Sequence, residues 1–225
     1  GTGAVSLVNT GTTSLIAAGV TAGTTASVSS SGNLTIGSNV SGPSGVTLTV
    51  TGGGGSLSHT AGTISTTASP ITLQADVISL AGASISSGAA NTYILPMTGG
   101  TPSSLGGAAG FDLTDTELNT ITAGTIFVGE DSAAARTSAT LTVGASSAVN
   151  LGARNITLSG SNIQGGANTL TTGALGLKAA NGIGSATTLA TASSSIAIAN
   201  TAAGIVSIQD SRAGGTSVSG SNAAA

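Results

Sequence analysis

The chain of 225 residues contains no cysteine and no tryptophan, and its aromatic side chains are limited to Tyr93, Phe111 and Phe127. The absence of cysteine excludes disulfide bonds and thiolate metal sites. Aromatic side chains are the main large space-fillers of compact cores, so a core built almost without them must be thin and made of Val, Ile, Leu and Ala. The composition therefore predicts a narrow interior rather than an ordinary globular core.

Charged residues are also scarce, at 5% of the chain, and the formal net charge is -3. The basic residues stand singly along the sequence: Arg136, Arg154, Lys178 and Arg212. A nucleic-acid surface needs clustered cations that release counterions, so no nucleic-acid partner is predicted. Disorder is also not expected, because it combines low hydrophobicity with high net charge, whereas the mean hydropathy here is +0.43.

Long hydrophobic runs are missing as well, and none approaches the ~20 residues that span a bilayer as a helix. No charged segment followed by an apolar one stands at Gly1, so a secretion signal is expected to be cleaved or to lie far upstream. Neither end shows the polar cap that closes a repeat protein. Residues 1–225 are therefore interpreted as a single segment of a longer chain, with residues 217–225 frayed.

What the sequence does contain is a recurring run of three to five residues, in which Ile, Val or Leu alternates with Thr, Ser or Asn. Gly or Ala closes most of these runs. Examples are Leu34–Ile36, Val46–Val50, Ile71–Leu73, Ile156–Leu158 and Ile196–Ile198. Alternation with period two places the apolar side chains on one face of a strand.

The spacing of these runs indicates how the strands are connected. Inward positions follow one another by 8, 7, 5, 7 and 7 residues at Val143, Leu151, Leu158, Ile163, Leu170 and Leu177. Strands this short, joined by so few turn residues, do not suit a sandwich and instead suit a coil that turns a corner after each run. The prediction is an all-β fold, a right-handed parallel β-helix with about three short strands per coil and roughly 20 residues per turn.

Residues 89–125 interrupt this pattern and are interpreted as a side excursion from the solenoid. The segment Thr114-x-x-Glu117 has the form of a capping box, which predicts a helix of one or two turns. Leu113, Leu118 and Ile121 are predicted to face the solenoid. The excursion is the place where lateral contacts are expected.

Several phrases resemble the repeats of very large filamentous-haemagglutinin-like exoproteins. They are Pro70–Asp76, Thr92–Thr98 and above all Leu113–Ile126, which reads LTDTELNTITAGTI, with a further recurring phrase at Leu175–Ala186. The resemblance covers about residues 69–200. Residues 1–68 resemble the family only in general character and contain none of these phrases. It departs from the family pattern in lacking an Asn-Pro-Asn-Gly secretion-domain signature and a charged toxin-like tail.

The resemblance implies a bacterial protein that is secreted or lies on the outer cell surface. It also implies an outer-membrane export partner and a long right-handed parallel β-helix. Relatives of this kind act in adhesion, aggregation, biofilm matrix or contact-dependent competition. Because the secretion signature is missing, the segment is expected to be stalk rather than targeting region.

Five of the seven acidic residues gather between positions 112 and 131: Asp112, Asp115, Glu117, Glu130 and Asp131. Paired carboxylates could serve glycoside or polyuronate cleavage, or bind calcium. Sugar-processing sites also need cations and aromatic platforms, which are nearly missing here, and the glycine-rich Gly106–Leu113 lacks the adjacent copies that a calcium β-roll needs. A structural role is therefore predicted for these acids.

The remaining candidates also favour a structural interpretation. His59 has no cysteine or neighbouring carboxylate in sequence, and it is predicted to be exposed in a loop or at a strand edge. Gly182-Ile183-Gly184 has no following helix and does not predict a dinucleotide site. Rows of threonine such as Thr47 and Thr49 suggest an ice-binding role as an alternative. Such a role requires the same row in every coil, and the rows here are not repeated from coil to coil.

The sequence thus predicts no enzyme and no catalytic, cofactor-binding or metal site. Two functions from different classes remain. The first is a structural stalk segment of a cell-surface or secreted adhesin that mediates attachment, aggregation or biofilm through an unknown receptor. The second is a self-associating extracellular fibre, sheath or matrix protein, joined end to end or laterally, because open terminal coils present unpaired backbone groups.

Overall fold

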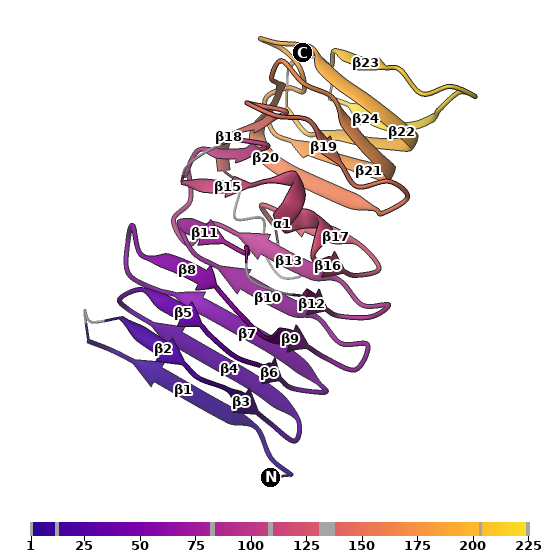
Figure 1. The fold of residues 1–225 in the computed structure, drawn as a ribbon. Coiled ribbons are helices and arrows are strands. Elements are labelled where there is room, and N and C mark those ends of the chain that lie inside the picture. The colour runs from indigo at the N-terminus through magenta and orange to yellow at the C-terminus, as the bar shows by residue number, and fades with distance from the viewer. Residues whose placement is uncertain are drawn as a thin grey trace. The chain divides into compact units, whose positions relative to one another are not determined.

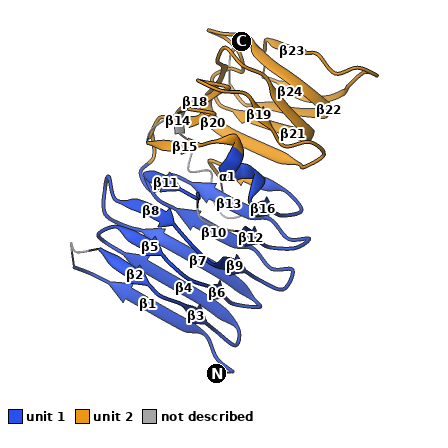
Figure 2. Cartoon of the chain, viewed as in Figure 1, with its two compact units in different colours: residues 1–98, 116–126 blue, residues 99–115, 127–225 orange. Residues whose placement is uncertain are grey.

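The computed structural model describes residues 2–11, 14–81, 84–107, 110–130, 138–202 and 204–223. The chain divides into two compact units (Figure 2). Unit 1 comprises Gly1–Thr98 and Thr116–Ile126, and unit 2 comprises Gly99–Asp115 and Phe127–Ala225. All described strand pairs within the units are parallel, and they wind each unit into a β-solenoid (Figure 1). The predicted all-β parallel β-helix is confirmed.

Unit 1 stacks short strands into three parallel sheets, as three strands per coil predicts. The first sheet contains β1 (Val5–Asn9), β4 (Thr25–Ser30), β7 (Gly45–Val50), β10 (Ile71–Gln74) and β13 (Thr92–Leu95). The second contains β2 (Leu15–Ala17), β5 (Leu34–Ile36), β8 (Ser56–His59) and β11 (Val77–Ser79). The third contains β3 (Val20–Thr21), β6 (Val40–Ser41), β9 (Thr63–Ser65), β12 (Ser84–Ser86) and β16 (Ile121–Thr122).

The core of unit 1 consists of columns of aliphatic side chains, one column for each sheet. In the first sheet the register places Leu7, Val28, Leu48, Leu73 and Ile94 above one another, at steps of 21, 20, 25 and 21 residues. The last four of these side chains are fully buried. Each such side chain contributes roughly 1.5–3 kcal/mol by leaving water, so stacked columns supply a driving force without aromatic residues.

The other two sheets of unit 1 follow the same rule. Leu34, Leu57 and Ile78 form a column in the second sheet, and Val40, Ile64, Ile85 and Ile121 form one in the third. The outward positions between them carry Ser and Thr, as the period-two alternation predicts.

Unit 2 is built from longer strands. Its strands are β14 (Ser103–Leu105), β15 (Phe111–Leu113), β18 (Ser138–Val143), β19 (Val149–Asn150), β20 (Ile156–Gly165), β21 (Leu170–Ala179), β22 (Leu189–Asn200), β23 (Ile208–Asp210) and β24 (Ser217–Asn222). The prediction of runs of three to five residues is therefore wrong for β20, β21 and β22, which have 10 to 12 residues. β17 (Ile126–Val128) contains the point where the chain passes from unit 1 to unit 2.

The long strands exist because the hydrogen-bond ladder continues through a corner. β21 pairs with β19 at Leu170 and with β20 from Leu175 onward, so one strand serves two successive faces of the coil. Gly173 lies between these two stretches, and a Cβ atom there would lie only 2.4 Å from the carbonyl oxygen of Ala153. The close approach of two backbones at the bend thus requires glycine.

The core of unit 2 is also columnar. Ile156, Leu175, Ile196 and Val218 share one column, and Leu158, Leu177, Ile198 and Gly220 share the next. All the predicted inward positions from Val143 to Leu177 are buried, which confirms the predicted strand faces.

The excursion predicted at 89–125 differs from the structure at both its ends. Within unit 1, β13 continues the ladder of β10 because Ile94 fits the column above Leu73, and β16 pairs with β12 because Ile121 fits the column above Ile85. The short helix is present as α1 (Asp115–Asn119). Leu113, Leu118 and Ile121 are fully buried, as predicted.

The predicted fraying of residues 217–225 is not found over Ser217–Asn222. These residues form β24, which pairs with β22 through six consecutive residue pairs. The interpretation rested on a missing apolar pattern, and the ladder forms without one because its hydrogen bonds join backbone groups. Residues 224 and 225 lie outside the described residues.

Candidate functional site

The acidic residues singled out from the sequence do not gather into one site. Asp112 is almost fully buried in unit 2, where its Oδ1 accepts hydrogen bonds from Ser104 Oγ at 2.6 Å and from Gly107 N at 2.8 Å. A Cβ atom at Gly107 would lie 2.7 Å from that same oxygen. The carboxylate therefore closes the turn between β14 and β15. Over the described residues, no group of three or more His, Cys, Asp and Glu side chains could hold a metal ion.

Asp115 and Glu117 belong to α1 and each accepts a backbone hydrogen bond inside its own unit. Asp115 Oδ1 accepts from Asn150 N at 2.6 Å in unit 2. Glu117 Oε1 accepts from Leu80 N at 2.7 Å in unit 1, where the side chain is buried. The helix begins one residue after Thr114, as the capping motif predicts. Both carboxylates hold backbone in place, which is the structural role predicted for them.

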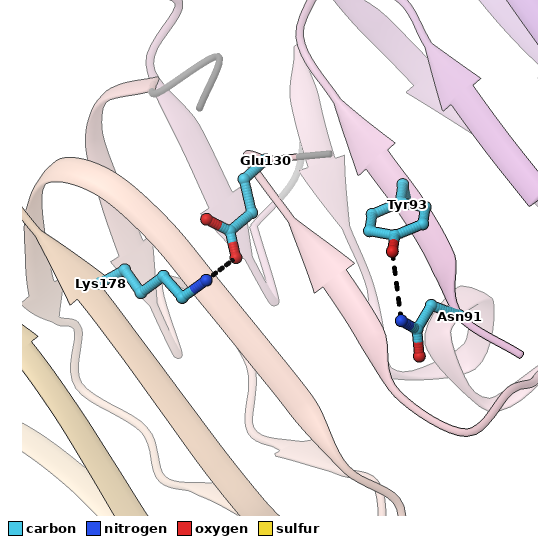
Figure 3. Close-up of polar contacts among 4 residues, drawn as sticks. All are labelled: Asn91, Tyr93, Glu130 and Lys178. Atoms are coloured by element: carbon cyan, nitrogen blue, oxygen red, sulfur yellow. Dashed lines mark hydrogen bonds and ion pairs between the residues drawn. The ribbon is translucent and has the colours of Figure 1, made fainter. Parts of the chain in front are cut away.

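Glu130 forms an ion pair with Lys178, with 2.5 Å between Oε1 and Nζ (Figure 3). The ammonium group also lies 5.8 Å from the centre of the Phe127 ring, within the range of a cation–π interaction. The Glu130 side chain is buried and the Lys178 side chain is half exposed. The pair lines a cavity of about 210 Å³ together with Ser159 and small residues. Asp131 lies outside the described residues.

His59 lies inside unit 1, so the prediction of an exposed residue is wrong. It is 1% exposed and continues the column of Ile36, because its position at the end of β8 points inward. Its Nε2 donates to Gly62 O at 3.1 Å, while Nδ1 is buried without a partner among the described residues. The pKa of His59 lies below its ordinary value because burial disfavours the charged ring. The backbone hydrogen bonds to Gly62 and Ala61 act in the opposite direction and are outweighed.

Asp210 in unit 2 is a carboxylate that the sequence did not single out. Its Oδ2 accepts from Thr191 Oγ1 at 2.8 Å and from Ser193 N at 2.9 Å. Its Oδ1 accepts from Arg212 N at 3.0 Å and from Thr216 Oγ1 at 2.7 Å. Burial alone would raise the pKa of Asp210, but these four hydrogen bonds lower it below its ordinary value. The carboxylate thus fastens the loop between β23 and β24 to β22.

A groove of about 610 Å³ crosses unit 2 beside this loop. Apart from Arg212, its lining consists of small and polar residues: Gly152, Ala153, Asn155, Thr171, Thr172, Gly173, Ala174, Ala192, Ser194, Ser211 and Ala213. Much of the polar lining is already engaged: Thr172 Oγ1 donates to Arg154 O, Ser194 Oγ donates to Gly173 O, and Asn155 Oδ1 accepts from Ala174 N. Arg212 is the one charged side chain in the lining. The groove therefore offers little that would define a ligand.

Tyr93 is buried in β13, and its hydroxyl accepts a hydrogen bond from Asn91 Nδ2 at 3.1 Å (Figure 3). Both residues belong to unit 1. The single tyrosine is therefore part of the packed wall of a coil and does not form an exposed platform for a sugar ring.

The most distinctive surface features lie in the first and last coils. Over the described residues, the exposed large apolar side chains are confined to these two coils: Leu7, Val8, Ile16, Ile205 and Val218. Val8 and Ile16 stand above outward positions that the next coil fills with Ser29 and Thr35.

The edge formed by β24 also contains a cavity, of about 250 Å³. Ile198, Val206, Val218 and Gly220 contribute to its lining. Gly220 occupies the column that Leu158, Leu177 and Ile198 fill below it, and at φ +130° it leaves the next position of that column empty of any side chain. In the described residues β24 pairs with β22 alone.

Comparisons of the chain with protein-family models, with curated proteins and with solved structures found no match. The resemblance to filamentous-haemagglutinin-like repeats therefore stays a prediction from the quoted phrases. Among the described residues, no helix is long and apolar enough to cross a membrane.

The terminal surfaces could have been anticipated only in part. Val8 and Ile16 break the rule that outward positions carry Ser or Thr, and this break is visible once the register is known. Asp210 gives no such signal, because two of its four donors, Thr191 and Ser193, lie in β22, which only the ladder brings beside Asp210.

Proposed function

We propose that this chain is a structural stalk segment of a bacterial adhesin that is secreted or held at the outer cell surface. The observation that carries the proposal is the coil-on-coil stacking of aliphatic columns within each unit, with outward faces of small polar residues. Such stacking builds an extended scaffold in which each coil contacts only its neighbours, which suits a stalk. The quoted repeat phrases support the same role.

The proposal includes attachment, aggregation or biofilm as the activity of the whole adhesin, with export through an outer-membrane partner. It assigns no catalytic role, since the acids that could have formed a sugar-cleaving pair hold backbone amides instead. Sugar release that disappears in the double variant Asp115→Ala, Glu117→Ala would contradict this assignment.

Surface display tests the stalk proposal. The chain is displayed on a non-adherent bacterium, and attachment to glass and to cultured epithelial cells under flow is compared with that of cells carrying the anchor alone. We expect more attached cells or faster cell aggregation with the chain than with the anchor. The variant Leu158→Asp, which disrupts the core of unit 2, should lose this gain. Equal attachment of cells with the chain and with the anchor would refute the proposal.

The second candidate function is a self-associating extracellular fibre, sheath or matrix. One observation favours it specifically, namely the small uncharged side chains on the outward faces of the described strands, which permit close lateral packing of neighbouring solenoids. Filaments formed by the purified chain alone, and unchanged by added cells, would support it.

A further inference from the structure

The ion pair of Glu130 and Lys178 belongs to an outward row of side chains on unit 2. Ser159 of β20 and Lys178 of β21 are paired in register, beside the buried leucine column. On the preceding coil, a Cβ atom at Gly129 would lie 2.2 Å from Ser159 O, and Glu130 follows directly. Ser159 therefore lies between the two charged residues, which join above it (Figure 3).

This pair leaves hydrogen-bonding capacity unused at the cavity of about 210 Å³ that it lines. Glu130 receives the ammonium group on Oε1, while its Oε2 makes no hydrogen bond within the described residues. Neither Oε2 nor the Ser159 hydroxyl is sealed from water. An ammonium group has three donors, and Lys178 directs one of them at Glu130. A free acceptor, a free hydroxyl and free donors thus meet at one cavity.

The rest of the cavity lining consists of small residues: Gly160, Ala179, Ala180, Ala199 and Thr201. Thr201 Oγ1 already donates to Ala179 O at 3.3 Å, so this part of the wall is mainly apolar. Such a wall accommodates the C–H face of a saturated ring. Pockets for drug-sized ligands measure about 300–1,000 Å³, so this smaller cavity suits a single ring.

The charge balance at the cavity favours a neutral ligand. The carboxylate and the ammonium group cancel, and a charged ligand would compete for one of them and leave the other without its partner. A hydroxyl group both donates and accepts, so two adjacent hydroxyls match a carboxylate oxygen that lies beside an ammonium group. Pyranose sugars combine such a pair of hydroxyls with an apolar ring face.

We propose that the cavity beside Glu130 and Lys178 binds one neutral pyranose ring through two adjacent hydroxyl groups. One hydroxyl donates to Glu130 Oε2, the next accepts from Lys178 Nζ, and Ser159 Oγ bonds to the same pair of hydroxyls. The ring face lies against Ala180 and Ala199. This inference goes beyond the proposed stalk function, which needs no ligand in unit 2. The site is formed by residues between positions 130 and 201, inside the stacked coils.

The single lysine of the chain allows binding to be measured at the site itself. Isotope-labelled lysine gives one Cε resonance, that of Lys178. The resonance is followed by NMR during titration with glucose, galactose and mannose, and with the corresponding uronates and amino sugars. We expect at least one neutral sugar to shift it with a Kd of about 1 mM, because few hydrogen bonds hold so small a ligand. The charged sugars should bind roughly tenfold more weakly.

Two variants locate the sugar, and a third serves as the control. Ser159→Ala removes the hydroxyl and keeps the ion pair, and Glu130→Gln keeps the size of the side chain and removes its charge. Each should raise the Kd of the neutral sugar by about tenfold. Glu130→Gln also leaves Lys178 without its anion, so this variant should gain affinity for the uronates. Ser195→Ala changes a residue of β22 outside the cavity lining and should bind like the unaltered chain.

A Lys178 resonance that none of the neutral sugars shifts, in a chain with the circular dichroism of the folded state, would overturn the inference. An unchanged Kd in both Ser159→Ala and Glu130→Gln would do the same, as would tighter binding of a uronate than of any neutral sugar by the unaltered chain. Display on glass, which carries no sugar, separates this inference from the stalk proposal. Equal attachment of cells with the chain and with the anchor contradicts the stalk and leaves the titration unaffected.

Discussion

Unit 1 and unit 2 make the same kind of coil in different ways. Unit 1 breaks each coil into separate strands of two to six residues, and its sheets meet at corners where the ladder stops. Unit 2 carries β20, β21 and β22 through a corner, so that 10 to 12 residues remain hydrogen-bonded without interruption. An aliphatic column therefore requires stacked strands, but the hydrogen-bond ladder can either stop at a corner or continue through it.

The interiors differ as well. Unit 1 has a titratable group, His59, in one of its core columns, where a carbonyl oxygen accepts its hydrogen bond. In unit 2 the column of Val149 and Leu170 turns polar at Thr191 and ends at Asp210. Each unit therefore has its own weak point, and the two weak points respond to different changes.

The largest expected effect comes from a charge placed in a column. Leu48→Asp in unit 1 and Leu158→Asp in unit 2 each bury an unpaired carboxylate, which costs about 3–5 kcal/mol or more. We expect each variant to lose the urea transition of its own unit, as followed by circular dichroism. The controls Thr47→Asp and Ala197→Asp lie on exposed outward positions and should change stability by less than about 0.5 kcal/mol. Unchanged stability of Leu158→Asp would mean that the strand faces are assigned wrongly.

The next effect separates a crowded corner from an open one. Gly184 in unit 2 and Gly54 in unit 1 both have positive φ, at +66° and +74°. A Cβ atom at Gly184 would lie 1.9 Å from Ser207 O, whereas nothing lies within 4 Å of one at Gly54. We expect Gly54→Ala to cost about 1–2 kcal/mol, from backbone strain alone, and Gly184→Ala to cost about 1–3 kcal/mol more. Equal losses in thermal unfolding would show that the close approach at Gly184 is not rigid.

Removal of the Asp210 carboxylate should have a smaller effect that is confined to unit 2. Asp210→Asn keeps the shape of the side chain but loses its charge and some of its acceptor capacity, which costs about 1–3 kcal/mol. Because the pKa of Asp210 lies below 3.8 in the folded chain, its contribution is complete above pH 3.8 and is lost as the pH falls through the folded pKa. Unit 2 should therefore weaken only in strong acid, and Asp210→Asn should flatten that dependence.

Unit 1 should respond to milder acid, through His59, with the smallest effect of the four. Its folded pKa is depressed below 6.5, so unit 1 has full stability above pH 6.5 and loses stability as the pH falls below that value. Urea unfolding between pH 7.5 and 5 measures the loss. His59→Leu should remove the dependence, at a cost of about 1 kcal/mol at neutral pH because the Nε2 hydrogen bond to Gly62 O is lost. A dependence that persists in His59→Leu would assign it to another group.

The sequence predicts the fold well because one rule governs it. Alternating apolar positions such as Leu34 and Ile36 place their side chains inward whichever coil they belong to. What sequence reasoning could not supply is the partner of a side chain across coils. Glu117 and Leu80 are 37 residues apart, and only the ladder brings them into hydrogen-bonding distance.

His59 is a second residue whose environment could not be predicted without the register of the strands. A lone histidine is ordinarily expected at the surface, and only its register beside Ile36 places it in a core column. The length of β20 to β22 was also hidden, because Ser, Gly and Thr at a bend read as turn residues even where the ladder continues through them.

The unequal steps of the first column of unit 1 have a consequence for how such a molecule can change. Leu48 and Leu73 are adjacent in the column although 25 residues separate them, whereas 20 residues separate Val28 from Leu48. The spacing between neighbouring strands is fixed at about 4.8 Å by hydrogen bonding. The length of a unit along its axis therefore depends on the number of turns, so corner loops can gain or lose residues without changing that length. The length of the unit along its axis changes only when a whole turn is added or removed.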